Sequence, residues 1–167
     1  MIPPSSIEPD VELRVFLQNK VRVGLAGGGS QMVTVYGDWE RPTNMLPDDF
    51  IVIYQNGDVE GIGMENDFAR GYIMVGLYCK LNDDGSVKKN RVKKLLMQLD
   101  DIFIDRIEDP LTHVVTEERY KKLVTDNYVY EYDAQRFITP TTPNQTSGYS
   151  ITNLNLRWHT TNNFNKE

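Results

Sequence analysis

The chain has 167 residues, and its 18 Lys and Arg against 24 Asp and Glu give a net charge of −6 at pH 7. A chain of this length can bury a core without staples, and its single cysteine excludes an intramolecular disulfide framework and a structural zinc site. The acidic balance argues against a nucleic-acid coat. No apolar run approaches the roughly 20 residues of a membrane span, and Met1–Ser6 lacks the basic and apolar parts of a secretory signal. We therefore expect a soluble protein made in a reducing cytoplasm, with no membrane contact.

The first predicted elements are a helix and two strands. Apolar residues at helical spacing predict an amphipathic helix over Ile7–Leu25, which Gly27–Gly29 terminates. Met32–Tyr36 predicts a short strand, and the polar stretch Gly37–Asp49 a long loop. Phe50–Tyr54 is apolar on both faces. This favours an interior strand with helices packed on one face. The other face is also expected to be covered, either by the same chain or by another molecule.

The middle of the chain predicts a loop, a strand and a helix. Asn56–Gly71 is Gly-rich and acidic, which indicates an extended, mobile loop. Tyr72–Leu81 alternates, so its aliphatic residues and Cys79 face one way, as in a strand with a small, buried cysteine. Ser86 is the expected N-cap of a second helix, which runs to about Asp105.

The last third of the chain is less regular. Thr116–Leu123 predicts a short third helix with an acidic start. Tyr128–Tyr132 and Arg136–Ile138 favour strand or extended structure, and residues 139–148 form a surface loop. Tyr149–Thr160 alternates and predicts a closing strand.

These elements together predict an α+β fold. It has a mainly antiparallel sheet of about four strands, two helices packed on one face, long loops and a C-terminal strand. Residues 1–167 form a single domain in this prediction. Its core comprises residues 7–105 and 149–160, residues 106–148 form an extension or arm, and residues 161–167 form a frayed tail.

No residue pattern points to catalysis. His113 and His159 lie in no metal or triad spacing. Asp100–Asp101, like the other adjacent acidic pairs, is expected in a turn or on an exposed helical face, where neighbouring side chains diverge. We therefore predict no enzyme, and no catalytic, cofactor-binding or metal-binding residues. A small metal-dependent hydrolase or nuclease remains an alternative, in which folding would combine Lys80 with carboxylates from Asp58, Glu60 or Asp67.

Two groups of residues favour a protein that binds other proteins. Apolar side chains on polar stretches either contact a neighbouring subunit or fold back on their own domain. Basic side chains crowd the first half of the second helix, against the preference of the helix dipole, and either meet a partner or form a solvated face. The candidate subunit contacts are Trp39, Met45, Leu46, Ile62, Met64 and Phe68, and the candidate charged partner face is Lys88, Lys89, Arg91, Lys93 and Lys94.

The order of elements resembles the tail terminator proteins of tailed bacteriophages, also called tail completion or head-tail joining proteins. The resemblance rests on a leading amphipathic helix, a strand at Val33–Tyr36, a Pro-containing loop entering the apolar strand Pro47–Ile53, a long strand at Gly71–Leu81 and a helix at Val87–Phe103. It covers about Ile7–Asp105 and the closing strand. The stretch 106–148 is longer than expected of a minimal member, and the Gly37–Asp49 loop is bulky.

The resemblance implies a structural virion protein. Six copies are expected to form a ring at the head-proximal end of the tail tube, where the ring stops tube growth and receives the head. The partners are then further copies of the chain, the tail tube protein and a head completion or connector protein, within the virion neck and, during assembly, the host cytoplasm. DNA passes through the lumen without specific binding, repelled by a loop carrying Asp58, Glu60, Glu65 and Asp67. Another neck protein, such as a head completion protein, is the nearest alternative.

Overall fold

The computed structural model describes residues 7–25, 27–40, 42, 45–62, 68–133, 141–144 and 146–161, without the side chains of residues 39, 56–59 and 62. Within these ranges it contains helices α1 (Pro9–Lys20) and α2 (Lys89–Phe103) and a short 3₁₀ helix at Asp38–Glu40. The strands are β1 (Arg22–Gly24), β2 (Ser30–Met32), β3 (Thr34–Gly37), β4 (Asp49–Ile62), β5 (Phe68–Lys80), β6 (Ile104–Glu108), β7 (Val115–Tyr120), β8 (Leu123–Val124), β9 (Tyr128–Tyr132), β10 (Thr142–Asn144) and β11 (Tyr149–Thr160).

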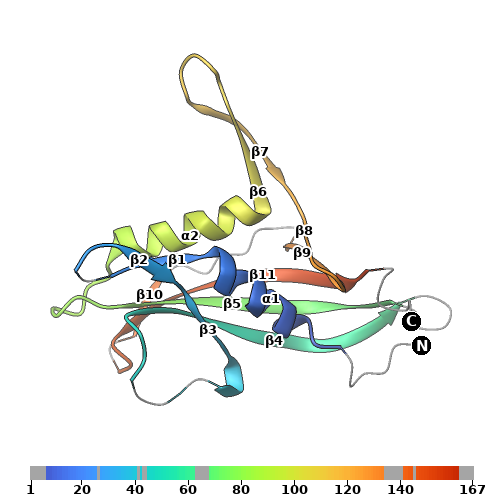
Figure 1. The fold of residues 1–167 in the computed structure, drawn as a ribbon, viewed down its shortest axis with the longest axis horizontal. Coiled ribbons are helices and arrows are strands. Elements are labelled where there is room, and N and C mark those ends of the chain that lie inside the picture. Colours follow the sequence, from blue (N-terminus) through green and yellow to red (C-terminus); the bar gives the residue numbers. More distant parts are fainter. Residues whose placement is uncertain are drawn as a thin grey trace.

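Most strands belong to one curled sheet with the order β3-β4-β5-β11-β9-β8, and β10 also pairs with β11 (Figure 1). β3 runs parallel to β4, whereas the other pairs in this sheet are antiparallel. The described residues also form two separate ribbons, β1-β2 and β6-β7. The expected sheet of about four antiparallel strands is therefore wrong, because the sheet is larger and mixed.

Two polar segments account for much of this difference. Asn56–Gly71 was expected as a loop, but its described residues, 56–62 and 68–71, continue β4 and β5 through the pairs Glu60↔Arg70 and Ile62↔Phe68. Thr116–Leu123, expected as a helix, contributes most of β7. A strand pair needs only backbone N–H and C=O partners, so it forms without an apolar face. Hydrophobic periodicity therefore gave no sign of either strand.

Both helices cover the same face of the sheet, where the main core lies. The alternation predicted for β5 is confirmed, since Ile73, Val75, Leu77 and Cys79 are all buried on this face. Burial raises the pKa of the Cys79 thiol to about 12, which keeps it protonated at neutral pH. Each fully buried aliphatic side chain contributes about 1.5–3 kcal/mol to stability. The helices supply Leu13, Leu17, Leu95 and Leu99 to this core.

The opposite face of the sheet carries a second, smaller apolar cluster. Phe50 is fully buried there and stacks on Tyr78 with ring centroids 4.8 Å apart. Leu46 packs against this cluster, and the Tyr149 hydroxyl donates a hydrogen bond to the Pro47 carbonyl at 2.8 Å. The chain itself therefore covers this end of the second face.

The helices are shorter than predicted. α1 ends at Lys20, because the following residues form β1, which turns back to β2. Gly28 and Gly29 take φ values of 93° and 82° in that turn, which only glycine adopts without strain. The glycine segment is thus a hairpin turn. Ser86 does not cap α2, since its hydroxyl donates to the Asp84 carboxylate and the helix begins at Lys89.

Two elements near the end of the chain agree with expectation, whereas the surface loop expected over residues 139–148 contains β10 (Thr142–Asn144), which pairs with β11. β9 and β11 have the predicted bounds, and Leu154, Leu156 and Trp158 of β11 are buried in the main core. Arg136–Ile138 lies outside the described residues, as does the tail after residue 161. Neither helix among the described residues has the length and apolarity needed to cross a membrane.

Candidate functional site

A two-stranded ribbon projects from the body of the protein. α2 passes directly into β6, which pairs antiparallel with β7, and we call residues 104–120 the arm (Figure 1). Every β7 side chain is exposed, and Leu111 in the turn is 88% exposed. Apolar side chains in such a position become buried only against another molecule. Those on the arm are Ile107, Leu111, Val114, Val115 and Tyr120.

Hydrogen bonds fix the turn of the arm. The Asp109 carboxylate accepts from the backbone N–H groups of Leu111 at 2.8 Å and Thr112 at 2.9 Å, and the Asp109 N–H donates to the Val114 carbonyl at 2.9 Å. The N–H groups of Thr112 and Leu111 lower the pKa of Asp109. His113 completes the turn with a φ of 57°. The turn thus presents Leu111 beside a fixed negative charge.

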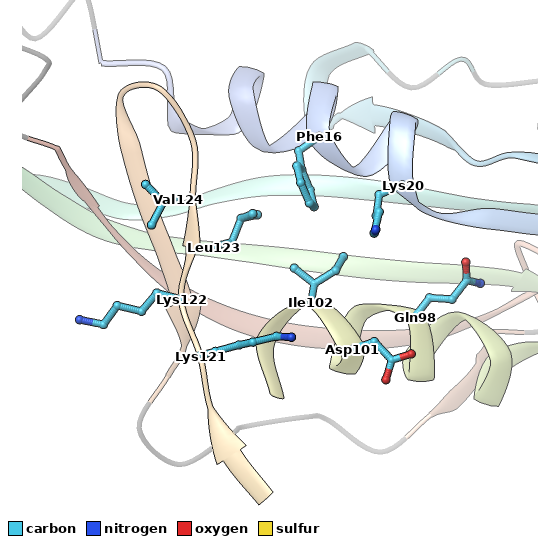
Figure 2. Close-up of a pocket in the computed structure, with 9 residues that line it drawn as sticks. All are labelled: Phe16, Lys20, Gln98, Asp101, Ile102, Lys121, Lys122, Leu123 and Val124. Carbon is cyan, nitrogen blue, oxygen red and sulfur yellow. The ribbon is translucent and has the colours of Figure 1, made fainter. Parts of the chain in front are cut away.

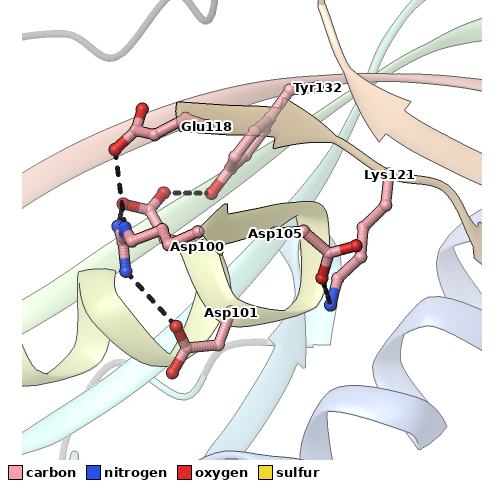
Figure 3. A network of polar contacts seen from close by, with 7 residues as sticks. Asp100, Asp101, Asp105, Glu118, Lys121 and Tyr132 are labelled. Atoms are coloured by element: carbon pink, nitrogen blue, oxygen red, sulfur yellow. Dashed lines mark hydrogen bonds and ion pairs between the residues drawn. The ribbon is translucent and has the colours of Figure 1, made fainter. Parts of the chain in front are cut away.

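Arg106 ties the base of the arm to α2. Its guanidinium donates to Asp100 at 2.9 Å and to Asp101 at 3.3 Å, and lies 3.5 Å from the Glu118 carboxylate on β7. The Tyr132 hydroxyl donates to the other Asp100 oxygen at 2.8 Å (Figure 3). Asp100 is buried, so its expected place on an exposed helical face is wrong. This network sets the direction in which the arm leaves the body.

A groove lies beside the base of the arm, between α1, the end of α2 and β8 (Figure 2). It consists of two adjoining hollows of about 450 Å³ and 460 Å³, which share Phe16, Lys20 and Val124. Val15 is 55% exposed and Val124 is 64% exposed, so the groove has apolar walls open to solvent. We call it the α1/β8 groove, lined by Val11, Val15, Phe16, Lys20, Leu123 and Val124.

Lysines gather at one end of this groove. Lys20 points from α1 toward α2, whereas Lys122 points away from the cleft (Figure 2). The Lys121 ammonium lies 2.8 Å from the Asp105 carboxylate, but among the described residues Lys20 has no carboxylate within 4.0 Å. Lys20 is therefore available to an anionic partner.

The described residues include no group of three or more His, Cys, Asp or Glu side chains that could hold a metal ion. No family model, curated protein or solved structure matches this chain.

The predicted lumen residues are only partly described. Glu60 lies on β4 and forms an exposed ion pair with Arg70 of β5 at 2.9 Å. The Asp58 side chain is not described, and Glu65 and Asp67 lie outside the described residues. Where it is described, this segment is the end of the β4-β5 hairpin.

The predicted apolar contacts divide into two outcomes. Met45 is 94% exposed and remains a candidate contact, whereas Leu46 folds back against its own chain. Phe68 is half-buried at the start of β5. Neither Trp39 nor Ile62 has a described side chain, and Met64 lies outside the described residues.

One residue of the predicted basic face, Arg91, forms an ion pair with a buried carboxylate. An Arg91 Nη2 lies 2.6 Å from the buried Asp49 carboxylate, and its Nε donates to the same oxygen at 2.9 Å. Burial raises the pKa of Asp49, and the Arg91 guanidinium opposes that rise. Lys88 is half-buried, and the exposed members of the face are Lys89, Lys93 and Lys94.

The pairing of β4 with β5 places Glu60 and Lys80, two residues of the predicted nuclease alternative, far apart. Glu60 pairs across the hairpin with Arg70, at one end of β5, while Lys80 ends the strand at the other. The distance along β5 is about 30 Å at the usual rise per residue. Lys80 lies 3.7 Å from Asp48 instead. Glu60 and Lys80 therefore do not converge on one site.

The sequence predicted an extension or arm over residues 106–148, but it predicted neither the β6-β7 ribbon nor the α1/β8 groove. One signal for the arm was present, since Asp109-Pro110 is a turn former between Ile104–Ile107 and the β-branched pair Val114-Val115. The groove left no local signal, because α1 and β8 are more than 100 residues apart and meet only in the folded chain.

Proposed function

We propose that the protein is a structural subunit of a tailed-bacteriophage virion. Copies of it assemble into a ring that terminates the tail tube and joins the tail to the head. The observation that carries this proposal is the arm, a hydrogen-bonded ribbon that is anchored at its base and exposes Leu111 at its turn. A rigid projecting element with an apolar tip is suited to a subunit contact, because its backbone is already ordered and binding costs little further conformational entropy.

A ring follows from the type of contact. If the arm of one copy binds a different surface of the next copy, the contact is heterologous. Such contacts form a closed ring when the rotation from one copy to the next is a whole-number fraction of 360°. The expected closure is a hexamer. Residues 106–120 of the arm lie in the stretch 106–148 that exceeds the minimal pattern of the family, which supports a specialised contact there.

The charge distribution is consistent with a channel for DNA. A net charge of −6 repels phosphates, so a DNA strand would slide past without being held. The proposal places residues 56–70 at the lumen. Because the Glu60 charge is balanced by Arg70, the acidic surplus of this segment comes from Asp58, Glu65 and Asp67. The exposed lysines of α2 then face an acidic neighbour, either the tube protein or the head connector.

The genetic test is an early stop codon in place of the Glu8 codon, introduced into the phage genome that encodes the chain. A terminator predicts tubes of irregular, excessive length and DNA-filled heads without tails, seen by electron microscopy. Supplying the wild-type gene in trans restores joined particles. Tails of normal length that stay separate from heads would identify a neck adaptor instead, and normal infectious particles would refute a role in the virion.

A further inference from the structure

The turn of the arm cannot enter the α1/β8 groove of its own chain. The β6-β7 ladder runs from Ile104↔Tyr120 to Glu108↔Val115, about 13 Å, and carries the turn away from the body (Figure 1). The Arg106 network holds the base of this ladder against α2. Leu111 is therefore presented to a second molecule.

The turn of the arm and the α1/β8 groove both expose aliphatic side chains. Leu111 and Val114 are exposed aliphatic side chains on one short turn. The groove offers Val15 and Val124 as exposed walls with the half-buried Phe16 between its two hollows. Seating the turn in the groove would cover exposed apolar surface on both molecules at once.

The charges of the two surfaces are complementary and also give a direction. Asp109 lies two residues from Leu111, and Lys20 lies one helical turn beyond Phe16 on α1. At the opposite end of the groove lie Glu12 and Asp126, which would repel Asp109 in a reversed insertion. Asp101 also lines the hollow at the Lys20 end, but its carboxylate lies 3.3 Å from the Arg106 guanidinium, which balances its charge. Only one orientation brings both the apolar and the charged groups together.

We infer that the turn of the arm of one copy inserts into the α1/β8 groove of the next copy, with Leu111 between Val15 and Val124 and Asp109 beside Lys20. The inference rests on the proposed ring and specifies its subunit contact. Because each copy has one arm and one groove on different parts of its surface, the contact is heterologous and propagates until the ring closes.

The test is a pair of introduced cysteines in the full-length protein. Leu111→Cys with Val15→Cys is expected to give covalent oligomers, up to the size of the closed ring, after mild oxidation and denaturing electrophoresis. The buried Cys79 keeps the background low. The matched control is Leu111→Cys with Asp83→Cys, since Asp83 is exposed in the turn before α2 and outside the groove. It is expected to give at least ten times less product.

A mixing experiment shows that the bond joins two molecules. Protein carrying only Leu111→Cys, mixed with protein carrying only Val15→Cys, is expected to form covalent dimers and nothing larger. Both sites are exposed, so neither substitution threatens folding.

The outcomes separate the contact from the ring. If the wild-type protein assembles but the Leu111/Val15 pair cross-links no more than the Asp83 control, the arm does not enter the groove and the ring uses another surface. If the wild-type protein stays monomeric both alone and with purified tail tubes, the ring itself fails, and the inferred contact falls with the proposed function.

Discussion

At the residue scale, Asp100 depends most on its neighbours. Its carboxylate is buried on α2 and receives one hydrogen bond from Arg106 and one from Tyr132. A buried carboxylate that loses its cationic partner retains its desolvation cost without compensation. The same two bonds connect α2, the arm and β9, so they link the arm to the core.

Replacing Arg106 with Met is expected to lower the free energy of unfolding by about 2–4 kcal/mol, because the buried Asp100 carboxylate loses its cationic partner. The matched control is Arg119→Met on β7, where an exposed pair with Glu117 contributes about 0–1 kcal/mol. Urea denaturation followed by Trp fluorescence measures both. Equal losses in the two variants would show that the Asp100 network adds no particular stability.

The raised pKa of Tyr128 makes the stability of the protein dependent on alkaline pH. Burial raises the pKa of Tyr128 to about 12 from its ordinary value of 10.0. Between these values the unfolded chain loses the proton while the folded chain keeps it, so stability is full below pH 10 and falls as the pH rises toward 12, by up to about 1.4 kcal/mol per pH unit. Tyr128→Phe should make this decline shallower in denaturation curves taken from pH 9 to 12. An unchanged slope would contradict the assignment.

At the element scale, β5 and β11 pack tightly at Gly71. Gly71 pairs with Trp158, and a Cβ added at Gly71 would lie 2.9 Å from the indole Cζ2. Trp158 is buried against Tyr128 in an edge-on contact, with ring centroids 5.6 Å apart, and so has little room to move.

Gly71→Ala is therefore expected to destabilise the protein by about 1–3 kcal/mol through overpacking. Gly24→Ala serves as the matched control, since a Cβ at Gly24 meets nothing within 4 Å. The two variants are compared by thermal unfolding. A Gly71→Ala protein as stable as the Gly24→Ala protein would mean that β5 and β11 are less tightly packed than described.

The elements that the sequence predicted well are those with an apolar face. β11 has the expected bounds and β5 the expected alternation, because period-2 burial decides both. The arm has no such face. Its β7 segment is fully exposed and carries Glu117, Glu118 and Arg119, so its strand form depends on pairing with β6 and on the Arg106 network. Those partners are visible only after folding.

The candidate site shows the same limit. Met45 is exposed and stays a predicted subunit contact, whereas Arg91 was predicted on a charged partner face and instead pairs with buried Asp49. A helix pattern gives the side on which Arg91 lies. It does not show that β4 places a carboxylate beside it.

At the scale of the whole molecule, a single arm contact is weak. Burying one Leu or Val side chain contributes about 1.5–3 kcal/mol, while association costs roughly 4–15 kcal/mol or more in lost freedom. One inserted turn therefore does not hold a stable dimer. A closed ring gives every copy two contacts, so assembly should proceed from monomers to complete rings with few intermediates, and a tail tube end would favour it as a template.

Native mass spectrometry of the wild-type protein and of Leu111→Asp, each alone and with purified tail tubes, tests the central claim most directly. The account predicts monomers and one closed ring for the wild type, and monomers alone for Leu111→Asp, whose new charge faces an apolar groove. Thr112→Asp, which adds the same charge one residue further along, should assemble like the wild type. Identical mass distributions for the wild type and Leu111→Asp would contradict the claim that the arm builds the ring.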